Sequence, residues 1–254
     1  DWSSDVCSSD LLGTAAAYTT VETDINNGLH DAIQVLEKTT GHLEFSETYA
    51  CSSAAGGLKM ISCGLVPELT AQASREASLG AGAKVWKTYS FQLTKGDMKE
   101  IEEYHPDIIL LTGGTDGGNT DCILYNAKML AGLSYDCPIV IAGNRCCADD
   151  CQEILEGRTT YICENVMPRL GELNIEPTQK QIREIFLNRI VQGKGLTQAM
   201  DLMSGIIMPT PSAMLTAMEL LSDGYDEIPG IGELVGVDLG GATTDVYSVA
   251  DGSP

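Results

Sequence analysis

Short apolar runs alternate regularly with helix-like segments between residues 84 and 166. Runs such as residues 108–111 and 139–142 are too short for helices and rich in branched side chains, which favours strands. The segments between them, such as residues 123–133, have helical length. Strands that alternate with helices predict parallel βαβ units, so we expect an α/β protein whose sheet is covered by helices.

The composition narrows the function. The chain has 254 residues and a formal net charge of -21. Nucleic-acid binding depends on clustered Lys and Arg, so this charge argues against a nucleic-acid partner. No apolar run approaches the roughly 20 residues that span a bilayer, and the first residues lack the pattern of a signal peptide. We therefore expect a cytoplasmic protein with no membrane partner.

The nine cysteines have irregular spacings, which predict neither a disulfide framework nor a zinc site. Cys147 and Cys151 would share one face of a helix and could suggest a soft metal, but free thiols in a reducing cytoplasm are the favoured interpretation. The histidines show no common motif, and none is assigned to catalysis.

The residues at both ends of the chain suggest that the sequence is a piece of a longer protein. The residues from Asp1 to Leu11 look like the in-frame translation of a common sequencing adapter, so we set residues 1–10 aside as a disordered artefact. The Gly-Ser-Pro turn that ends at Pro254 follows a strand pattern and should lead to another strand. We therefore expect natural sequence to be missing at both ends.

A predicted β-hairpin near the C-terminus contains the residues that most clearly indicate a chemical function. Residues 234–239 and 244–249 read as two strands that meet at Gly240-Gly241. These glycines let backbone N–H groups approach an anion without a Cβ in the way, and Thr243 and Thr244 add hydroxyl donors. An ordinary hairpin with a Gly-Gly turn is the alternative.

Two carboxylates flank this turn. Asp238 precedes it and could hold Mg²⁺ through water or orient an attacking water, because the charge of a transferring phosphoryl group has to be neutralised. Asp245 follows it and could support the turn or reach the metal. The candidate phosphate-binding residues are Gly240, Gly241, Ala242, Thr243, Thr244 and Asp245.

A second glycine-rich turn follows the predicted strand at residues 108–111. It lies between the carboxyl end of a strand and a helix N-terminus, where ligands of open α/β sheets collect. The next two strands end in Asn144 and Asn165, which would reach the same edge if all three strands are parallel neighbours. A plain βα loop with an Asn or Asp cap is the alternative. The candidate residues are Gly113, Gly114, Thr115, Asp116, Gly117, Gly118 and Asn119.

The eight residues Asp238–Asp245, of sequence DLGGATTD, resemble the second phosphate motif of the superfamily of actin, sugar kinases and heat-shock chaperones. Wider stretches resemble one branch of it, the MutL-type accessory protein of glutamate (methylaspartate) mutase. These stretches run in order through nearly the whole chain after Leu11. They are residues 53–60, 64–70, 112–119, 164–171 and 207–211.

This resemblance implies a partial actin-like ATPase (ribonuclease H-like) fold with an inserted Rossmann-like subdomain. The implied parts are an ATPase lobe at residues 11–83, the insertion at 84–166, and linking helices with the phosphate hairpin at 167–254. The implied ligands are ATP and Mg²⁺, with Asp238 as the catalytic residue, and adenosylcobalamin would be met only through the partner mutase.

The resemblance further implies a first phosphate hairpin upstream of Leu11 and an adenosine-contacting segment beyond Pro254. Without them, we expect the chain by itself to bind ATP poorly. The implied function is an ATP-dependent accessory or reactivating protein for a mutase. A small-molecule kinase on the same fold and a nucleotide-independent partner-binding module are the alternatives.

Overall fold

The computed structural model describes residues 11–18, 20, 25–52, 58–78, 81–193, 206–239 and 244–250. The adapter-like residues 1–10 lie outside this part of the chain, as do residues 240–243 of the hairpin turn. The chain divides into two compact units, Asp1–Ala50 with Asn188–Ile207, and Cys51–Leu187 with Met208–Pro254.

The larger unit contains a five-stranded sheet in the order β3-β2-β4-β5-β6. All four neighbouring pairs are parallel. The first strand of this sheet, β2, is therefore second in the order, and β3 lies at the edge beside it. The chain then crosses over β2 and adds β4, β5 and β6 in turn on the other side, as in doubly wound α/β folds. The strands are β2 (Leu58–Gly64), β3 (Ala83–Ser90), β4 (Ile108–Leu111), β5 (Ile139–Ile141) and β6 (Thr160–Ile162).

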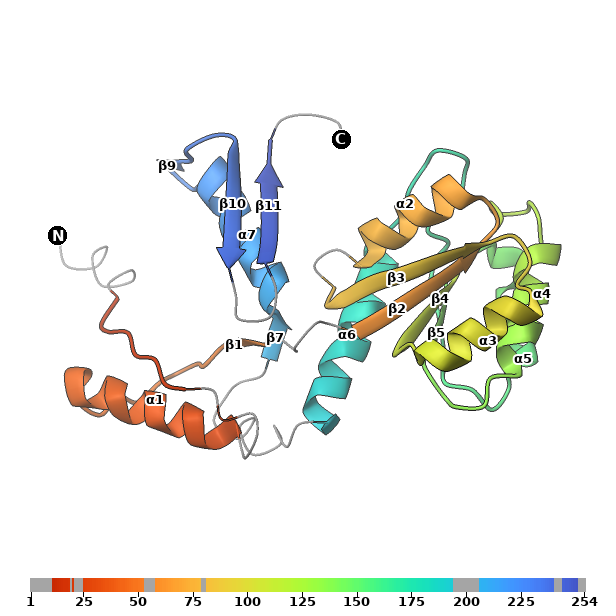
Figure 1. Ribbon diagram of the computed structural model, residues 1–254. Coiled ribbons are helices and arrows are strands. Elements are labelled where there is room, and N and C mark those ends of the chain that lie inside the picture. The colour runs from red at the N-terminus through yellow and green to blue at the C-terminus, as the bar shows by residue number, and fades with distance from the viewer. Residues whose placement is uncertain are drawn as a thin grey trace. The chain divides into compact units, whose positions relative to one another are not determined.

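Helices cover both faces of this sheet (Figure 1). One face packs on α3 (Lys95–Tyr104), α4 (Asp121–Ala131) and α5 (Ala148–Ile154), with Ile109, Leu111 and Ile123 in a common buried cluster. The other face carries α2 (Pro67–Ser78) and α6 (Glu176–Gly193), which are joined by a hydrogen bond from Gln179 Nε2 to the carbonyl of Glu76. Burial on both faces explains why β4 is a continuous apolar run. The predicted α/β class is confirmed.

The sheet begins earlier in the chain than the predicted insertion at residues 84–166. The strand β2, which the sequence analysis placed in the lobe at 11–83, pairs with both β3 and β4. The predicted boundary at Lys84 falls within β3, and β2 lies on the other side of this boundary from its strand partners. A strand buried on both faces shows no alternation that would reveal its neighbours. The assignment of the other segments to an actin-like lobe stays a prediction.

The C-terminal segment forms the predicted hairpin. The antiparallel strands β10 (Leu234–Leu239) and β11 (Thr244–Val249) pair with Asp238 opposite Asp245. Helix α7 (Thr210–Asp223) packs against the hairpin, and a Cβ on Gly236 would lie 2.8 Å from the sulfur of Met218. The short strands β8 (Gly224–Tyr225) and β9 (Ile228–Pro229) connect α7 to the hairpin.

The smaller unit contains helix α1 (Ile25–Thr40), which ends before Gly41 at a φ of 78°. The strands β1 (Ala50–Ser52) and β7 (Ile206–Pro209) pair with each other. Across the described part of the chain, no helix is both long enough and apolar enough to cross a membrane.

Candidate functional site

The carboxyl ends of β4, β5 and β6 meet at one edge of the sheet, and the loop at residues 112–120 lies along this edge. Gly113 and Gly114 have φ angles of 134° and 74°, which side chains rarely adopt. A Cβ on Gly114 would overlap the carbonyl oxygen of Asn119. Asn119 in turn contacts the first turn of α4, because its Oδ1 accepts the N–H of Cys122 at 3.1 Å. Glycine at 114 therefore allows the loop to fold back onto the start of the helix.

Asn144, at the end of β5, holds this loop from one side. Its Oδ1 accepts the backbone N–H of Gly117 at 3.0 Å, and its Nδ2 donates to the carbonyl of Gly118 at 3.2 Å. The side chain is fully buried. A buried amide whose oxygen and nitrogen are both satisfied fixes the loop in a single arrangement.

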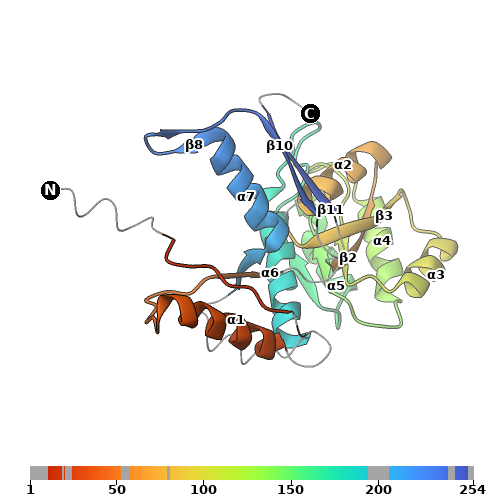
Figure 2. The same cartoon turned by 60° about the vertical axis from the view of Figure 1, so that its left-hand side comes forward.

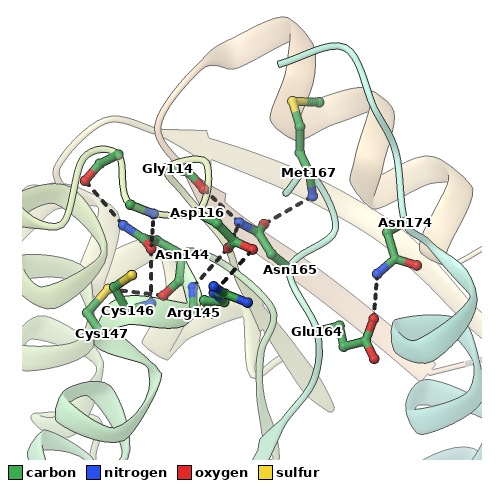
Figure 3. Close-up of polar contacts among 12 residues, drawn as sticks. Gly114, Asp116, Asn144, Arg145, Cys146, Cys147, Glu164, Asn165, Met167 and Asn174 are labelled. Carbon is green, nitrogen blue, oxygen red and sulfur yellow. Dashed lines mark hydrogen bonds and ion pairs between the residues drawn. The ribbon is translucent and has the colours of Figure 1, made fainter. Parts of the chain in front are cut away.

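Asn165, after β6, holds the loop from the other side. Its Nδ2 donates to the carbonyl of Gly114 at 3.0 Å and to the carboxylate of Asp116 at 2.9 Å, while its Oδ1 accepts the N–H of Met167 at 3.0 Å. Asp116 also accepts the backbone N–H of Arg145 at 3.1 Å. Figure 3 shows Asp116 between Asn165 and Arg145.

The sequence analysis expected these polar side chains at one edge, and the structure brings Asn144 and Asn165 onto the glycine-rich loop as expected. Their hydrogen bonds are used within the protein, so both residues hold the loop in shape. Glu164, which directly precedes Asn165 in the chain, is exposed and accepts a hydrogen bond from Asn174 at 2.9 Å. It does not join the contacts at the loop (Figure 3).

A cavity of about 180 Å³ lies beside this loop. The turn after β2 and the first turns of α2 form one wall, the loop after β4 forms another, and the segment after β6 closes the third side. The lining residues are Leu65, Val66, Leu69, Thr70, Ala73, Thr112, Gly113, Gly114, Thr115, Asn119, Asn165, Val166, Met167 and Leu170. Sequence reasoning expected the second and third of these walls. It did not place the helix that begins at Pro67 at this site, because that contact depends on the crossover from β2 to β3.

Two neighbouring cysteines, Cys147 and Cys151, are buried free thiols on η1 (Arg145–Cys147) and α5. Burial raises the pKa of both, that of Cys151 to about 12. Cys146 is exposed. Among the described residues, no three His, Cys, Asp or Glu side chains are grouped so that they could hold a metal ion.

At the hairpin, the structure places only some of the candidate residues. Asp238 lies opposite Asp245 and Leu239 opposite Thr244 in the strand register, whereas Gly240, Gly241, Ala242 and Thr243 lie outside the described residues. Asp238 and Asp245 are both partly buried. Burial first, and then the charges of Asp245 and Asp238, raise the pKa of Tyr247 on β11. The two carboxylates therefore act on the same small region.

Sequence reasoning assigned no function to the N-terminus of α7. Strand β10 runs antiparallel to α7, so the turn end of the hairpin lies toward the first turn of the helix (Figures 1 and 2). That turn has no acidic residue and no side-chain cap. Arg183 of α6 donates from Nη2 to the hydroxyl of Ser212 at 3.3 Å, and its buried Nε has no hydrogen-bond partner among the described residues.

The fold and these sites define an α/β protein with a doubly wound parallel sheet, a cavity at its carboxyl edge and a separate carboxylate-bearing hairpin. The family model described as "MutL protein" matches residues 3–254. The chain is 50% identical over 257 residues to Protein MutL of Clostridium tetanomorphum, with 98% of this chain and 55% of that protein covered. The chain belongs to the MutL protein family, and it spans about half the length of this relative.

Proposed function

We propose that the full-length protein is an ATP-dependent accessory protein of an adenosylcobalamin-dependent mutase such as glutamate mutase, and that it reactivates this enzyme. Membership of the MutL family supports the proposal, together with the resemblance of the chain to mutase accessory proteins. The free thiols fit a reducing compartment, so we place the protein in the cytoplasm.

The observation that carries the nucleotide part is the pair of carboxylates next to the hairpin turn. Asp238 and Asp245 are strand partners and both are partly buried. Mg²⁺ is usually held by one or two carboxylates together with water and the phosphates of a substrate. This pair therefore fits a magnesium ion that arrives with a nucleotide. Phosphoryl transfer from bound MgATP would supply the free energy that drives a conformational change of the protein.

The first turn of α7 supports the same proposal. A helix N-terminus presents unpaired N–H groups and a partial positive charge, which favour an anion. No acidic side chain in the first turn of α7 opposes this, and the guanidinium of Arg183 lies at Ser212 in the same turn. Planar guanidinium groups bind phosphate oxygens through charge-assisted hydrogen bonds. Arg183 would thus bind a phosphate group of the nucleotide, and Asp238 would bind the magnesium ion held by the same phosphates.

The test measures MgATP binding and turnover by the full-length protein with three variants. Asp238→Ala should abolish turnover, because the carboxylate that holds the metal is lost. Arg183→Ala should weaken MgATP binding about tenfold, the effect of losing a charge-assisted hydrogen bond. Arg75→Ala removes an exposed arginine of α2 whose side chain makes no hydrogen bond or ion pair with the described residues, so binding should stay as in the wild type.

The proposed reactivation of a mutase is tested separately, by measuring mutase activity. Full-length protein, MgATP and an inactivated adenosylcobalamin-dependent mutase should together restore mutase activity, and Asp238→Ala should not. If the protein binds the mutase equally with and without nucleotide, and Asp238→Ala changes nothing, the hairpin is structural and the protein is a nucleotide-independent binding module.

A further inference from the structure

The cavity lies where the winding of the sheet changes direction. The chain leaves β2 through α2 on one face, whereas it leaves the neighbouring β4 through α4 on the other face. The two loops therefore separate and leave a crevice at the carboxyl edge, between residues 65–66 and residues 112–115. Such switch points are where open α/β sheets bind small molecules.

The lining of the cavity has two chemical halves. Leu65, Leu69, Ala73, Val166 and Met167 form an apolar half. A volume of about 180 Å³ is enough for a group the size of a benzene ring, because apolar cavities of about 150 Å³ bind benzene. The apolar half therefore limits the body of a ligand to a compact ring or a short branched chain.

The polar half of the lining is formed by threonine, asparagine and glycine residues that carry hydroxyl, amide and backbone N–H donors. Thr70 is only 5% exposed and lines the cavity, and its hydroxyl makes no hydrogen bond to any described residue. The backbone N–H groups of Gly113, Gly114 and Thr115 likewise donate to no described residue. A hydroxyl that lines a cavity and has no partner in the protein is available to a ligand.

The donors at this end are already in place before a ligand arrives. Asn144 and Asn165 hold the Gly113–Asn119 loop through buried hydrogen bonds. Gly64 has no side chain, and a Cβ there would overlap the hydroxyl of Thr70 and lie 2.7 Å from that of Thr112. A binding site whose donors are held in position loses less free energy on ordering a ligand.

Among the described residues, no charged side chain lines the cavity. A phosphate dianion would have no basic residue to neutralise its two charges there, whereas a carboxylate carries one charge and can accept hydrogen bonds from hydroxyl and backbone N–H donors. We propose that this cavity binds a small monocarboxylate with a compact apolar body, whose carboxylate meets Thr70 and the backbone of Gly113–Thr115. The proposal does not depend on nucleotide binding at the hairpin.

The test is an NMR titration of the full chain with benzoate, benzamide and benzene. Benzoate should shift the amide signals of Gly113, Gly114 and Thr115 and the methyl signals of Leu69 and Ala73. Benzamide should do the same more weakly, and benzene should shift only the methyl signals. Thr70→Val keeps the shape of the side chain and removes the hydroxyl, so it should weaken benzoate binding about five- to tenfold and leave benzene binding unchanged.

The matched control is Thr160→Val, which lies at the start of β6, at the opposite edge of the sheet, and should bind benzoate like the wild type. Ala73→Leu fills the apolar half and should abolish binding of all three probes, with folding checked by circular dichroism. The proposal is wrong if benzoate at millimolar concentration shifts none of the three loop amides, or if Thr70→Val and Thr160→Val bind it equally.

Discussion

Asn165 donates a hydrogen bond of 2.9 Å to the carboxylate of Asp116, which lies 49 residues earlier in the chain. The same amide nitrogen donates to the carbonyl of Gly114, and Asn165 is only 3% exposed. One side chain thus ties the segment after β6 to the loop after β4. Because both segments line the cavity, its shape depends on this contact.

Asn165→Asp should therefore destabilise the protein by about 2–3 kcal/mol. The substitution removes both donated hydrogen bonds and places a second carboxylate beside Asp116. The loss should appear as a lower midpoint in urea denaturation at pH 7. Asn174→Asp is the matched control, because Asn174 also donates to a carboxylate, that of the exposed Glu164. It should cost less than about 1 kcal/mol, and equal losses for the two variants would contradict the role given to Asn165.

Gly114→Ala should be more destabilising than Gly117→Ala, although both glycines have a φ of 74°. Alanine in this left-handed region costs about 1–2 kcal/mol at either position. At Gly114 a Cβ also overlaps the carbonyl of Asn119, whereas at Gly117 it meets nothing within 4 Å. The two free energies of unfolding should therefore differ by at least about 1 kcal/mol. If they are the same, the close approach at Gly114 is relieved by a small movement of the loop.

The sequence predicted correctly those strands that have a clear local pattern. The runs at β4 and β5 and the strands of the hairpin were found because turn residues mark their ends and apolar residues fill them. If β4, β5 and β6 are predicted as parallel neighbours, it follows directly that Asn144 and Asn165 lie at the carboxyl edge of the sheet. The place of β2 was missed, because a strand buried on both faces does not reveal its partners.

The candidate site shows the same limit. Thr70 and Ala73 line the cavity only because α2 packs beside the crevice, and the spacing of residues within α2 does not reveal this contact. Arg183 meets Ser212 across 29 residues, through the packing of α6 near the start of α7. Both are contacts between distant segments, which the chain creates only when it folds.

Buried thiols should be protected from alkylation in the folded protein. Cys51 and Cys146 are exposed, whereas Cys63, Cys147 and Cys151 are buried. Because burial raises the pKa of Cys151 to about 12, only about one in ten thousand of its thiols would be ionised at pH 8, even with free access. Mass spectrometry after brief treatment with iodoacetamide should find Cys51 and Cys146 modified and Cys151 intact.

The same treatment in denaturant is the control, since every thiol then becomes accessible. Modification of Cys147 and Cys151 in the folded protein at the rate of Cys146 would show that α5 opens readily, and would contradict the burial of both thiols.

Stability should fall with acid partly through Glu102. Its carboxylate accepts the hydroxyl of Ser134 at 2.5 Å and the N–H of Ser134 at 2.6 Å, and these hydrogen bonds lower the pKa of Glu102. A carboxyl group whose pKa is lowered by folding adds stability above its unfolded pKa of about 4.3, and this contribution is lost as the pH falls through the folded pKa. Glu102→Gln should therefore be less stable than the wild type at pH 7 by about 0.5–1 kcal/mol, a range that allows for solvent screening.

The difference between wild type and Glu102→Gln should shrink as the pH is lowered below 4, because the wild-type carboxyl then becomes protonated. Urea denaturation at pH 7 and at about pH 3.5 measures both values. Glu103→Gln is the matched control on the same helix, since its ion pair with Lys99, at 3.6 Å, is exposed and worth only a few tenths of a kcal/mol. A difference for Glu102→Gln that is equally large at both pH values would show that lost packing, rather than the charge held by Ser134, accounts for the effect.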